Sequence, residues 1–460
     1  MGIHNIEKKS FGYSLLKSYG KWWHDKVFYN KVVYRNTEKV PLNDHLIFTA
    51  NHQNALMDAL AIGYSIKKQF VFVARSDIFK NKIIAQLLYF LKILPVYRIR
   101  DGYDTLKKNK KIFQKTLDVI NNKNGFVIMP EGNHASFRRL RPFKKGFARI
   151  AFQAEEAVNF SLDVKIIPVG INYSNYEKYR QDLLVNFGSL LSLSPFYQEY
   201  KNNPAKALNL VKAALSDSIR PLMIDIKSEK FYDTYDFSRT NFAELFCQKK
   251  GWDFNDLSSR FLAEKQIIKI LEEMENNSPS LFSEFSKNVN SVIREINLQK
   301  LNFRDVYNKK PSKINFTLKS AVLIIFSPVF IYGYLNHFFP YYLPVYASKK
   351  VKDPQFRSSF KYALSMFLFP LFYFGQTLLE GFIFSFNWIT IVYIITLPFF
   401  GAFSWKYSRI YLKNLKLYRL LQWGNLKNSN IKSVNKKISY ITNQIDYKIT
   451  KFIKEQNTIS

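Results

Sequence analysis

The chain contains a histidine and an aspartate, six residues apart, whose side chains are of the types used in general-base catalysis. His52 follows an apolar run at residues 46–50 that is typical of a buried strand, and Asp58 stands six residues later in a segment expected to be helical. A carboxylate beside an imidazole fixes its tautomer and stabilises the imidazolium that forms. Because a six-residue offset turns a continuous helix by about 240°, the two groups meet only if His52 lies in the turn before the helix.

A second polar group follows another candidate strand, at residues 125–129. Glu131, Gly132 and His134 come first, and no other acid occurs before Glu155. The basic residues in that interval are Arg138, Arg139, Arg141, Lys144, Lys145 and Arg149. Basic groups at strand ends beside a glycine turn favour an anionic ligand such as phosphate. The alternative, a solvated helix face, suits Arg139 and Lys145 better than Arg138.

The elements that must hold these residues are short strands alternating with helices, the pattern of an α/β fold. Candidate strands cover residues 46–50, 70–74, 125–129, 164–171 and 183–187. Helical spacing predicts one helix from Ser76 or Asp77 to about Leu91 and another over residues 104–121. After a break at residues 202–204, amphipathic helices over residues 205–302 are interpreted as a cap or connector.

Four segments resemble, in order and spacing, the sequence blocks of the glycerolipid acyltransferase superfamily. They are Asn51-His52 with Asp58, residues 95–98, residues 130–132 with 143–146, and residues 167–169. The superfamily includes the glycerol-3-phosphate and lysophosphatidate acyltransferases, and the resemblance covers roughly residues 30–190. A domain of this kind followed by hydrophobic segments is similar to the fungal glycerol-3-phosphate/dihydroxyacetone-phosphate acyltransferases.

The resemblance implies an α/β acyltransferase domain, a mixed sheet flanked by helices, with a catalytic role for His52. This histidine would take the proton from a glycerol hydroxyl while that oxygen attacks an acyl thioester, and Asp58 would orient it. No acyl-enzyme is required, which agrees with the absence of a serine or cysteine in a nucleophile-elbow context.

The same resemblance assigns substrate contacts. Arg98 would hold the phosphate of the acceptor, Glu131 and Gly132 would shape the acceptor pocket, and Pro168 would help to form the acyl-donor side. Arg138 and Lys144, in the basic run, are placed to bind the phosphates of the acceptor or donor. A phosphate pinned by arginine makes the attack nearly unimolecular.

Two positions depart from the pattern of the family. Five residues, 53–57, separate His52 from Asp58, where the family commonly has four. Asn133-His134 stands where the family often has Thr-Arg. His134 either takes over a phosphate contact or is a surface residue.

Long uncharged stretches predict membrane segments near the C-terminal end. Between Lys361 and Lys406 the only charged residue is Glu380, and a spanning helix needs about 20 apolar residues. Spans at about 362–379 and 387–405 would form a hairpin with its basic flanks on the cytoplasmic side. The 29 uncharged residues 320–348 are too few for two crossings, so they form a re-entrant or interfacial pair, or a third span.

Both ends of the chain have alternative interpretations. Apolar and aromatic residues at helical spacing within residues 1–30 suit a helix in the membrane interface, or a helix that covers a core. Neither a secretory signal nor a myristoylation motif is recognised there. Residues 406–460 hold twelve basic and two acidic residues, which would attract anionic lipid or simply solvate a helix.

The composition limits the classes of function. A net charge of +33 over 460 residues calls for an anionic partner, and 47% apolar residues exclude a disordered or fibrous chain. The single cysteine, Cys247, suggests a reducing compartment. Nucleic acid is not expected as the partner, because the bases cluster beside membrane segments and no nucleic-acid motif occurs. No metal is expected, since His52 and Asp58 lack further ligands nearby.

We therefore predict an integral membrane O-acyltransferase of phospholipid biosynthesis, with its catalytic domain on the cytoplasmic face. The acceptor would be glycerol-3-phosphate or 1-acyl-glycerol-3-phosphate (lysophosphatidate), the donor acyl-CoA or acyl-carrier protein, with no further cofactor. The alternative is a non-catalytic basic adaptor that binds anionic membrane lipids. The predicted division is an interfacial helix (1–30), the α/β acyltransferase domain (31–200), a helical region (201–315), membrane segments (316–405) and a basic cytoplasmic tail (406–460).

Overall fold

The computed structural model describes residues 5–96, 105–135, 137–307, 312–425 and 430–459. The chain divides into two compact units, which are described separately. The first unit comprises Met1–Asp225 with Ala347–Ala363, and the second comprises Ile226–Tyr346 with Leu364–Ser460. The first unit therefore includes a short segment that is far from the rest of it in sequence.

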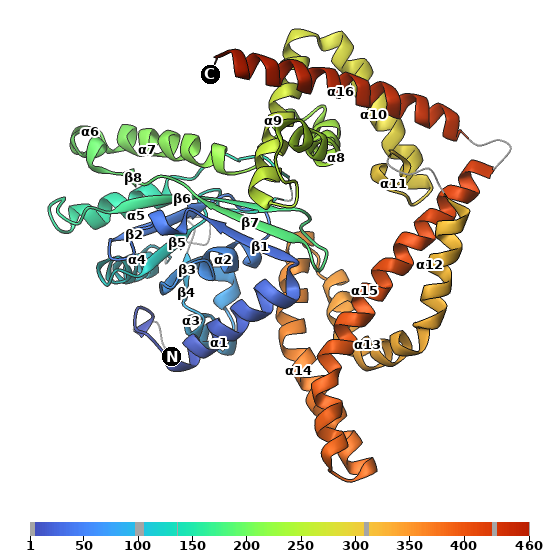
Figure 1. Ribbon diagram of the computed structural model, residues 1–460. Helices are drawn as coiled ribbons and strands as arrows, with labels where there is room; N and C mark the ends of the chain where they lie inside the picture. The colour runs from blue at the N-terminus through green and yellow to red at the C-terminus, as the bar shows by residue number, and fades with distance from the viewer. Residues whose placement is uncertain (1–4, 97–104, 136, 308–311, 426–429, 460) are drawn as a thin grey trace. The chain divides into compact units, whose positions relative to one another are not determined.

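Eight strands form one mixed sheet in the described part of the first unit (Figure 1). They are β1 (Lys31–Arg35), β2 (Leu46–Ala50), β3 (Phe70–Arg75), β4 (Ile93–Val96), β5 (Gly125–Ile128), β6 (Lys165–Tyr173), β7 (Asp182–Phe187) and β8 (Leu191–Ser192). Their order is β1-β7-β6-β2-β5-β3-β4, with β8 also paired to β6. Only the β6–β7 and β6–β8 pairs are antiparallel. The predicted α/β class with a mixed sheet is confirmed.

The five strands expected from the sequence are all present, with ends that differ by one or two residues. The sequence reading missed three strands, β1, β4 and β8. Charged Lys31 and Arg35 bound the short edge strand β1, and β8 has two residues, so neither shows a sustained apolar alternation. β4 contains Pro95, which weakens a strand pattern, but β4 is an edge strand where proline is tolerated.

Helices cover both faces of this sheet. In the first unit they are α1 (Phe11–Trp22), α2 (Leu56–Gly63), α3 (Lys82–Phe90), α4 (Thr105–Asn121), α5 (Gly146–Glu156), α6 (Tyr197–Asn202) and α7 (Pro204–Ile219). Ile47, Phe126 and Ile166 of the sheet share one buried cluster with residues of α4, α5 and α7, and Figure 1 shows α6 and α7 running along one side of the sheet. Phe48 and Phe70 point to the opposite face, where α2 lies against Phe72.

The predicted start of the helix after β3 is wrong. Ser76 begins a short 3-10 turn that ends at Phe79, and α3 starts only at Lys82. The cap is Asn81, whose side chain accepts hydrogen bonds from the amides of Ile83 and Ile84. An asparagine at this position satisfies two of the amides that a helix start leaves unpaired, and so it fixes the first turn.

The N-terminal helix α1 has one buried face and one exposed apolar face, so it has features of both interpretations of the sequence. Tyr13 of α1 is buried, as are Trp23 and Phe28 in the π-helical turn Trp23–Phe28 that follows. On the other side Phe11 is 86% exposed and Leu15 is 62% exposed. The helix therefore covers part of a core, and its exposed apolar side leaves the membrane-interface role as a prediction.

The second unit is helical throughout its described part. Its helices are α8 (Tyr232–Lys250), α9 (Leu257–Asn277), α10 (Pro279–Leu298), α11 (Phe303–Tyr307), α12 (Lys313–Ile325), α13 (Ser327–Lys349), α14 (Arg357–Phe384, from residue 364), α15 (Trp388–Asn425) and α16 (Ile431–Ile459). α8, α9 and α10 pack together, and α16 packs on all three. The tail helix α16 is thus a packed element, with Ile441, Ile445 and Ile449 fully buried. Its attraction to lipid stays a prediction.

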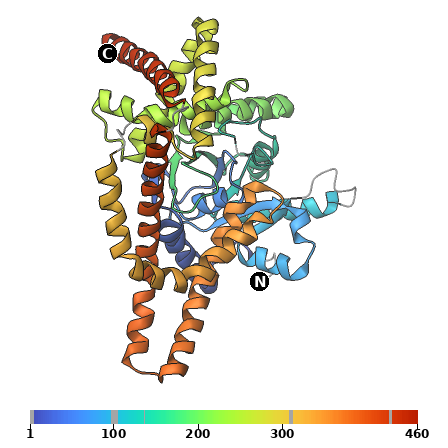
Figure 2. The same cartoon turned by 90° about the vertical axis from the view of Figure 1, so that its right-hand side faces the viewer.

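Two helices near the C-terminal end are long and apolar enough to cross a membrane, as expected. They are Pro354–Phe384 and Trp388–Asn425, with mean hydropathies of 1.4 and 1.6, and Figure 2 shows them in orange, side by side up to the turn that joins them. The earlier run forms α12 and α13, which bend by 61° at the break between them. A bend of this kind fits either a broken span or a re-entrant pair, so both alternatives remain.

Candidate active site

The site lies where β2 and β5 end. These strands are parallel neighbours, with Thr49 paired to Ile128, so the residues that follow them emerge at the same edge of the sheet. His52 comes two residues after β2, and Glu131 three residues after β5. β6 runs parallel to β2 on its other side and extends to Tyr173. Polar side chains from three consecutive strands therefore meet at one edge.

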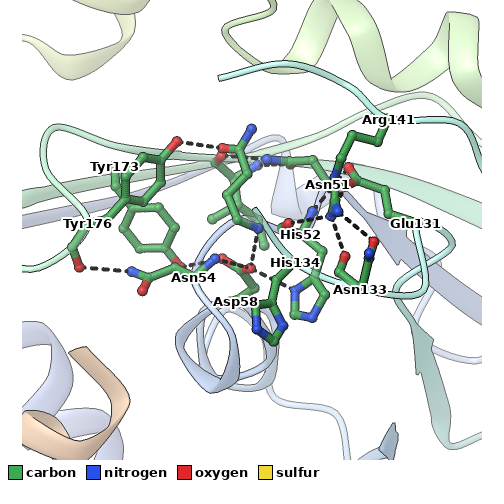
Figure 3. A network of polar contacts seen from close by, with 12 residues as sticks. Asn51, His52, Asn54, Asp58, Glu131, Asn133, His134, Arg141, Tyr173 and Tyr176 are labelled. Atoms are coloured by element: carbon green, nitrogen blue, oxygen red, sulfur yellow. Dashed lines mark hydrogen bonds and ion pairs between the residues drawn. The ribbon is translucent and has the colours of Figure 1, made fainter. Parts of the chain in front are cut away.

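His52 and Asp58 are hydrogen-bonded, as the proposed turn requires. His52 Nδ1 lies 2.9 Å from Asp58 Oδ2, and Figure 3 shows the two side chains facing each other. The same oxygen accepts from the amides of Gln53 (2.8 Å) and Asn54 (2.7 Å). Asp58 is fully buried, whereas the His52 side chain is 16% exposed. When Nδ1 donates to the carboxylate, Nε2 is the basic nitrogen, available to accept a proton.

The turn between β2 and α2 accommodates the extra residue between His52 and Asp58. α2 begins at Leu56, so His52 precedes the helix and its direction is not set by helical rotation. Ala55 adopts a positive φ of 44°, which costs an L-residue roughly 1–3 kcal/mol. Three bonds to one oxygen of Asp58 stabilise this strained turn and point His52 toward the carboxylate.

Tyr173 holds the other oxygen of Asp58. Its hydroxyl donates to Asp58 Oδ1 at 2.8 Å from the end of β6. Burial, with Asp58 beside it, raises the pKa of Tyr173 well above the usual value for a phenol, so the hydroxyl keeps its proton. Asn51 ties the ends of β2 and β6 together, because its side chain exchanges two hydrogen bonds with the backbone of Ile171. The orientation of Asp58 is therefore fixed from both strands.

Glu131 and Arg141 hold the backbone of His52. Glu131 Oε1 accepts from the His52 amide at 3.3 Å, and Arg141 donates to the His52 carbonyl at 3.1 Å. Arg141 Nε also donates to Glu131 Oε2 at 2.6 Å. Burial raises the pKa of Glu131 to about 7, although Arg141 and the His52 amide oppose the rise. The ion pair thus fixes the position of the base from both sides of its peptide unit.

Of the other residues predicted to bind the substrates, Gly132 and Lys144 lie beside Glu131, and Arg138 lies against Tyr176. Gly132 lies in the same loop with φ of +74°, and a Cβ there would lie 3.2 Å from the Lys144 side chain. Lys144 is exposed, and its amide donates to the Pro130 carbonyl. Arg138 is largely buried and lies 4.8 Å from the Tyr176 ring. Gly132 and Lys144 thus lie beside Glu131, and Arg138 packs on an aromatic ring.

One of the predicted residues is not brought to the site. Pro168 lies inside β6, paired with Thr49, and its ring packs against Gly188. It is therefore within the sheet, and not at the edge where His52 lies. Arg98 lies outside the described residues.

His134 lies beside His52 and is bonded to a residue that is distant in the sequence. Its ring centre lies 5.3 Å from that of His52, with the ring planes nearly perpendicular. Its Nε2 lies 2.8 Å from Asp353 Oδ2. His134 therefore belongs to the site.

Sequence reasoning missed the roles of Arg141, Tyr173 and Asn51. Arg141 is one of six basic residues between Arg138 and Arg149, and their order gives no sign of which one turns inward. Tyr173 ends a strand whose predicted end was two residues earlier. Asn51 precedes His52, and nothing in the sequence indicates that its side chain bonds Ile171.

The site contains groups for proton transfer and charge pairing. Among the residues with described positions, no group of three or more His, Cys, Asp or Glu side chains could hold a metal ion. The expectation of a reaction without a metal or further cofactor stays a prediction.

Comparisons with known proteins find similarity to acyltransferases. Residues 31–172 match the family model described as Acyltransferase. Glycerol-3-phosphate O-acyltransferase 2 of Saccharomyces cerevisiae is 27% identical over 112 residues, which are 24% of this chain and 15% of that protein. The 1-acyl-sn-glycerol-3-phosphate acyltransferase of Cocos nucifera is 30% identical over 111 residues, 24% of this chain and 34% of that protein. The matches thus span about a third or less of these relatives.

One solved structure is also similar. The crystal structure of the 1-acyl-sn-glycerophosphate acyltransferase of Thermotoga maritima aligns with a TM-score of 0.32 and 18% identity. The alignment covers 45% of this chain and 80% of that one.

Proposed function

We propose that this chain, whose residues 31–172 match the acyltransferase family model and resemble two glycerolipid acyltransferases, transfers a fatty acyl group from a thioester to glycerol-3-phosphate or its 1-acyl derivative. The observation that carries the mechanism is the bond between His52 Nδ1 and buried Asp58. This bond directs Nε2 outward as a general base. The non-catalytic adaptor is not favoured, because the family match covers the residues that form this pair.

In the proposed reaction His52 Nε2 takes the proton of the acceptor hydroxyl as its oxygen attacks the carbonyl carbon of the thioester. A C–O bond forms, the C–S bond breaks, and the proton passes to the departing thiolate. Asp58 stabilises the imidazolium between these steps. Glu131 and Arg141 keep the base in place through its backbone, so the ring needs little reorientation when the acceptor arrives.

The substrates and the membrane location are parts of the same proposal. The curated relatives are named for glycerol-3-phosphate and 1-acyl-glycerol-3-phosphate, which supports a phosphorylated glycerol acceptor. The donor would be acyl-CoA or acyl-carrier protein. Two apolar helices capable of crossing a membrane support an integral membrane protein. A cytoplasmic catalytic domain would follow from the basic flanks of those helices.

The test is acyl transfer by the full chain purified in detergent, with glycerol-3-phosphate and lysophosphatidate offered in competition. We expect His52→Ala to lower kcat by about 10²–10⁴-fold, the usual contribution of a general base. His45→Asn is the matched control, because His45 bonds the Ile120 carbonyl away from the site. Undiminished transfer by His52→Ala would rule out the mechanism, and the preferred acceptor in the competition would identify the substrate.

A further inference from the structure

A segment from outside the acyltransferase domain forms part of the first unit. Residues Ala347–Ala363 span the charged stretch that joins the two uncharged runs of the sequence, yet they belong to the same compact unit as the sheet. Tyr362 is almost fully buried, and its hydroxyl lies 3.0 Å from the Tyr64 hydroxyl and 2.8 Å from the Gly20 carbonyl. Lys361 donates to the Glu177 carbonyl. The end of this segment is thus attached to α1, α2 and the loop after β6.

The beginning of the segment reaches the candidate active site. Asp353 Oδ2 lies 2.8 Å from His134 Nε2, and the ring of Phe356 lies 4.9 Å from the same imidazole. Asp353 is itself held in place, because its Oδ1 accepts from the Gln355 amide at 3.1 Å. The carboxylate therefore meets His134 in an orientation set by its own turn.

His134 in turn packs against His52, with ring centres 5.3 Å apart. Figure 3 shows the two imidazoles next to each other, beside Asp58. Each histidine is bonded to one aspartate, His52 through Nδ1 and His134 through Nε2. Both side chains are 16% exposed, so both form part of the surface that an acceptor would meet.

We propose that Asp353 is a positioning residue of the active site, which holds the His134 imidazole against His52 so that it binds the acceptor beside the catalytic base. A carboxylate on Nε2 fixes the proton there, and it therefore holds the ring in one tautomer and one orientation beside His52. The acceptor site is then completed by the segment that joins the two uncharged runs. This inference rests on the proposed function.

The test compares steady-state kinetics of Asp353→Asn, His134→Gln, their double variant and the wild-type chain. We expect Asp353→Asn to raise the KM for the phosphorylated acceptor by about tenfold while kcat and the donor KM change little, the pattern of a lost binding contact. The double variant should be no worse than His134→Gln, because Asp353 acts through His134. Asp353→Glu, which keeps the carboxylate, should recover part of the affinity.

Glu177→Gln is the matched control. It removes a carboxylate that lies 3.6 Å from Arg357 in the same segment and does not bond His134, so acceptor KM should stay at the wild-type value. Equal effects of Glu177→Gln and Asp353→Asn would overturn the proposal, as would effects of Asp353→Asn and His134→Gln that multiply in the double variant.

A second measurement separates this inference from the proposed function. Histidine modification by diethyl pyrocarbonate, located by mass spectrometry, should be faster at His134 in Asp353→Asn than in the wild type or in Glu177→Gln. Unchanged modification at His134 would overturn the positioning role, whether or not the protein transfers acyl groups. If the wild-type chain itself transferred no acyl groups, that result would instead contradict the proposed function.

Discussion

At the scale of residues, one buried carboxylate organises the proposed catalytic turn. Asp58 accepts from His52, from the amides of Gln53 and Asn54, and from the Tyr173 hydroxyl. A carboxylate without solvent is stable only when its lone pairs are satisfied in this way. The hydrogen bonds that offset the cost of burying Asp58 therefore also orient His52.

Asp58→Asn should lower kcat by about 10²–10⁴-fold, because an amide can present N–H to Nδ1 and favour the wrong tautomer of His52. Tyr173→Phe is the control, since it removes only the bond to Oδ1. We expect it to retain activity within about tenfold of the wild type. Assays would be paired with thermal unfolding to confirm that both variants fold. Nearly full activity of Asp58→Asn would mean that another group orients His52.

Glu131 should make stability depend on pH. Its pKa is raised from 4.5 to about 7, so between these values the folded chain holds a proton that the unfolded chain has lost. The free energy of unfolding therefore falls as pH rises through this window. Glu131→Gln, which stays neutral, should lack this fall, so its melting temperature relative to the wild type should be higher at pH 8 than at pH 5. An equal difference at the two pH values would contradict the prediction.

At the scale of elements, the short turn Arg220–Leu222 is attached to strands β6 and β7 through one carbonyl. The Leu222 oxygen accepts from Asn172 on β6 at 3.0 Å and from Asn186 on β7 at 2.8 Å. Gly170 makes this approach possible, because a Cβ there would lie 2.1 Å from that oxygen. The absence of a side chain at Gly170 is what lets the end of α7 dock where the two antiparallel strands meet.

Gly170→Ala should destabilise the first unit by about 1–3 kcal/mol or more, as overpacking does in a filled core. The control is Gly146→Ala at the start of α5, where an added Cβ would meet no atom within 4 Å. Alanine should raise stability there by roughly 0.5–1 kcal/mol, since it restricts the unfolded chain. Thermal unfolding of both variants measures the difference. Equal melting temperatures would show that β6 can move away from the turn.

At the scale of the whole molecule, charge and hydropathy predict an orientation in the membrane. The turn between α14 and α15 carries no charge, whereas the residues before α14 and the second half of α15 are rich in lysine and arginine. Basic flanks remain on the cytoplasmic side. The turn should then lie on the opposite side from the tail helix α16.

Single cysteines would test this orientation in a Cys247→Ser background, because Cys247 is buried and is the only cysteine. In sealed vesicles with the periplasmic or extracellular side out, Asn387→Cys should react with a membrane-impermeant maleimide. Glu455→Cys should react only after the vesicles are opened. Labelling of both positions in sealed vesicles would contradict the hairpin.

Much of this protein could be predicted from local sequence patterns. The five strands, the helix over residues 105–121 and the two C-terminal apolar helices follow from the spacing or length of apolar runs. The turn that holds His52 follows from the six-residue offset to Asp58, which a continuous helix could not bridge. Such patterns report whether a residue is buried and which local hydrogen bonds its backbone makes. The start of α3 was mispredicted because Ser76 and Asp77 are also residues that can cap a helix, but they begin a short 3-10 turn and the cap is Asn81.

Only the tertiary structure decided which distant residues meet at the site. Arg141 pairs with Glu131, Tyr173 contacts Asp58 across 115 residues of sequence, and Asp353 contacts His134 across 219. Strand order and loop paths set these contacts, and neither leaves a periodic trace in the sequence. The sequence alone thus determined the chemical groups and the elements that carry them. The folded chain decided which distant groups meet, such as Asp353 with His134, because that depends on distances in space and not along the chain.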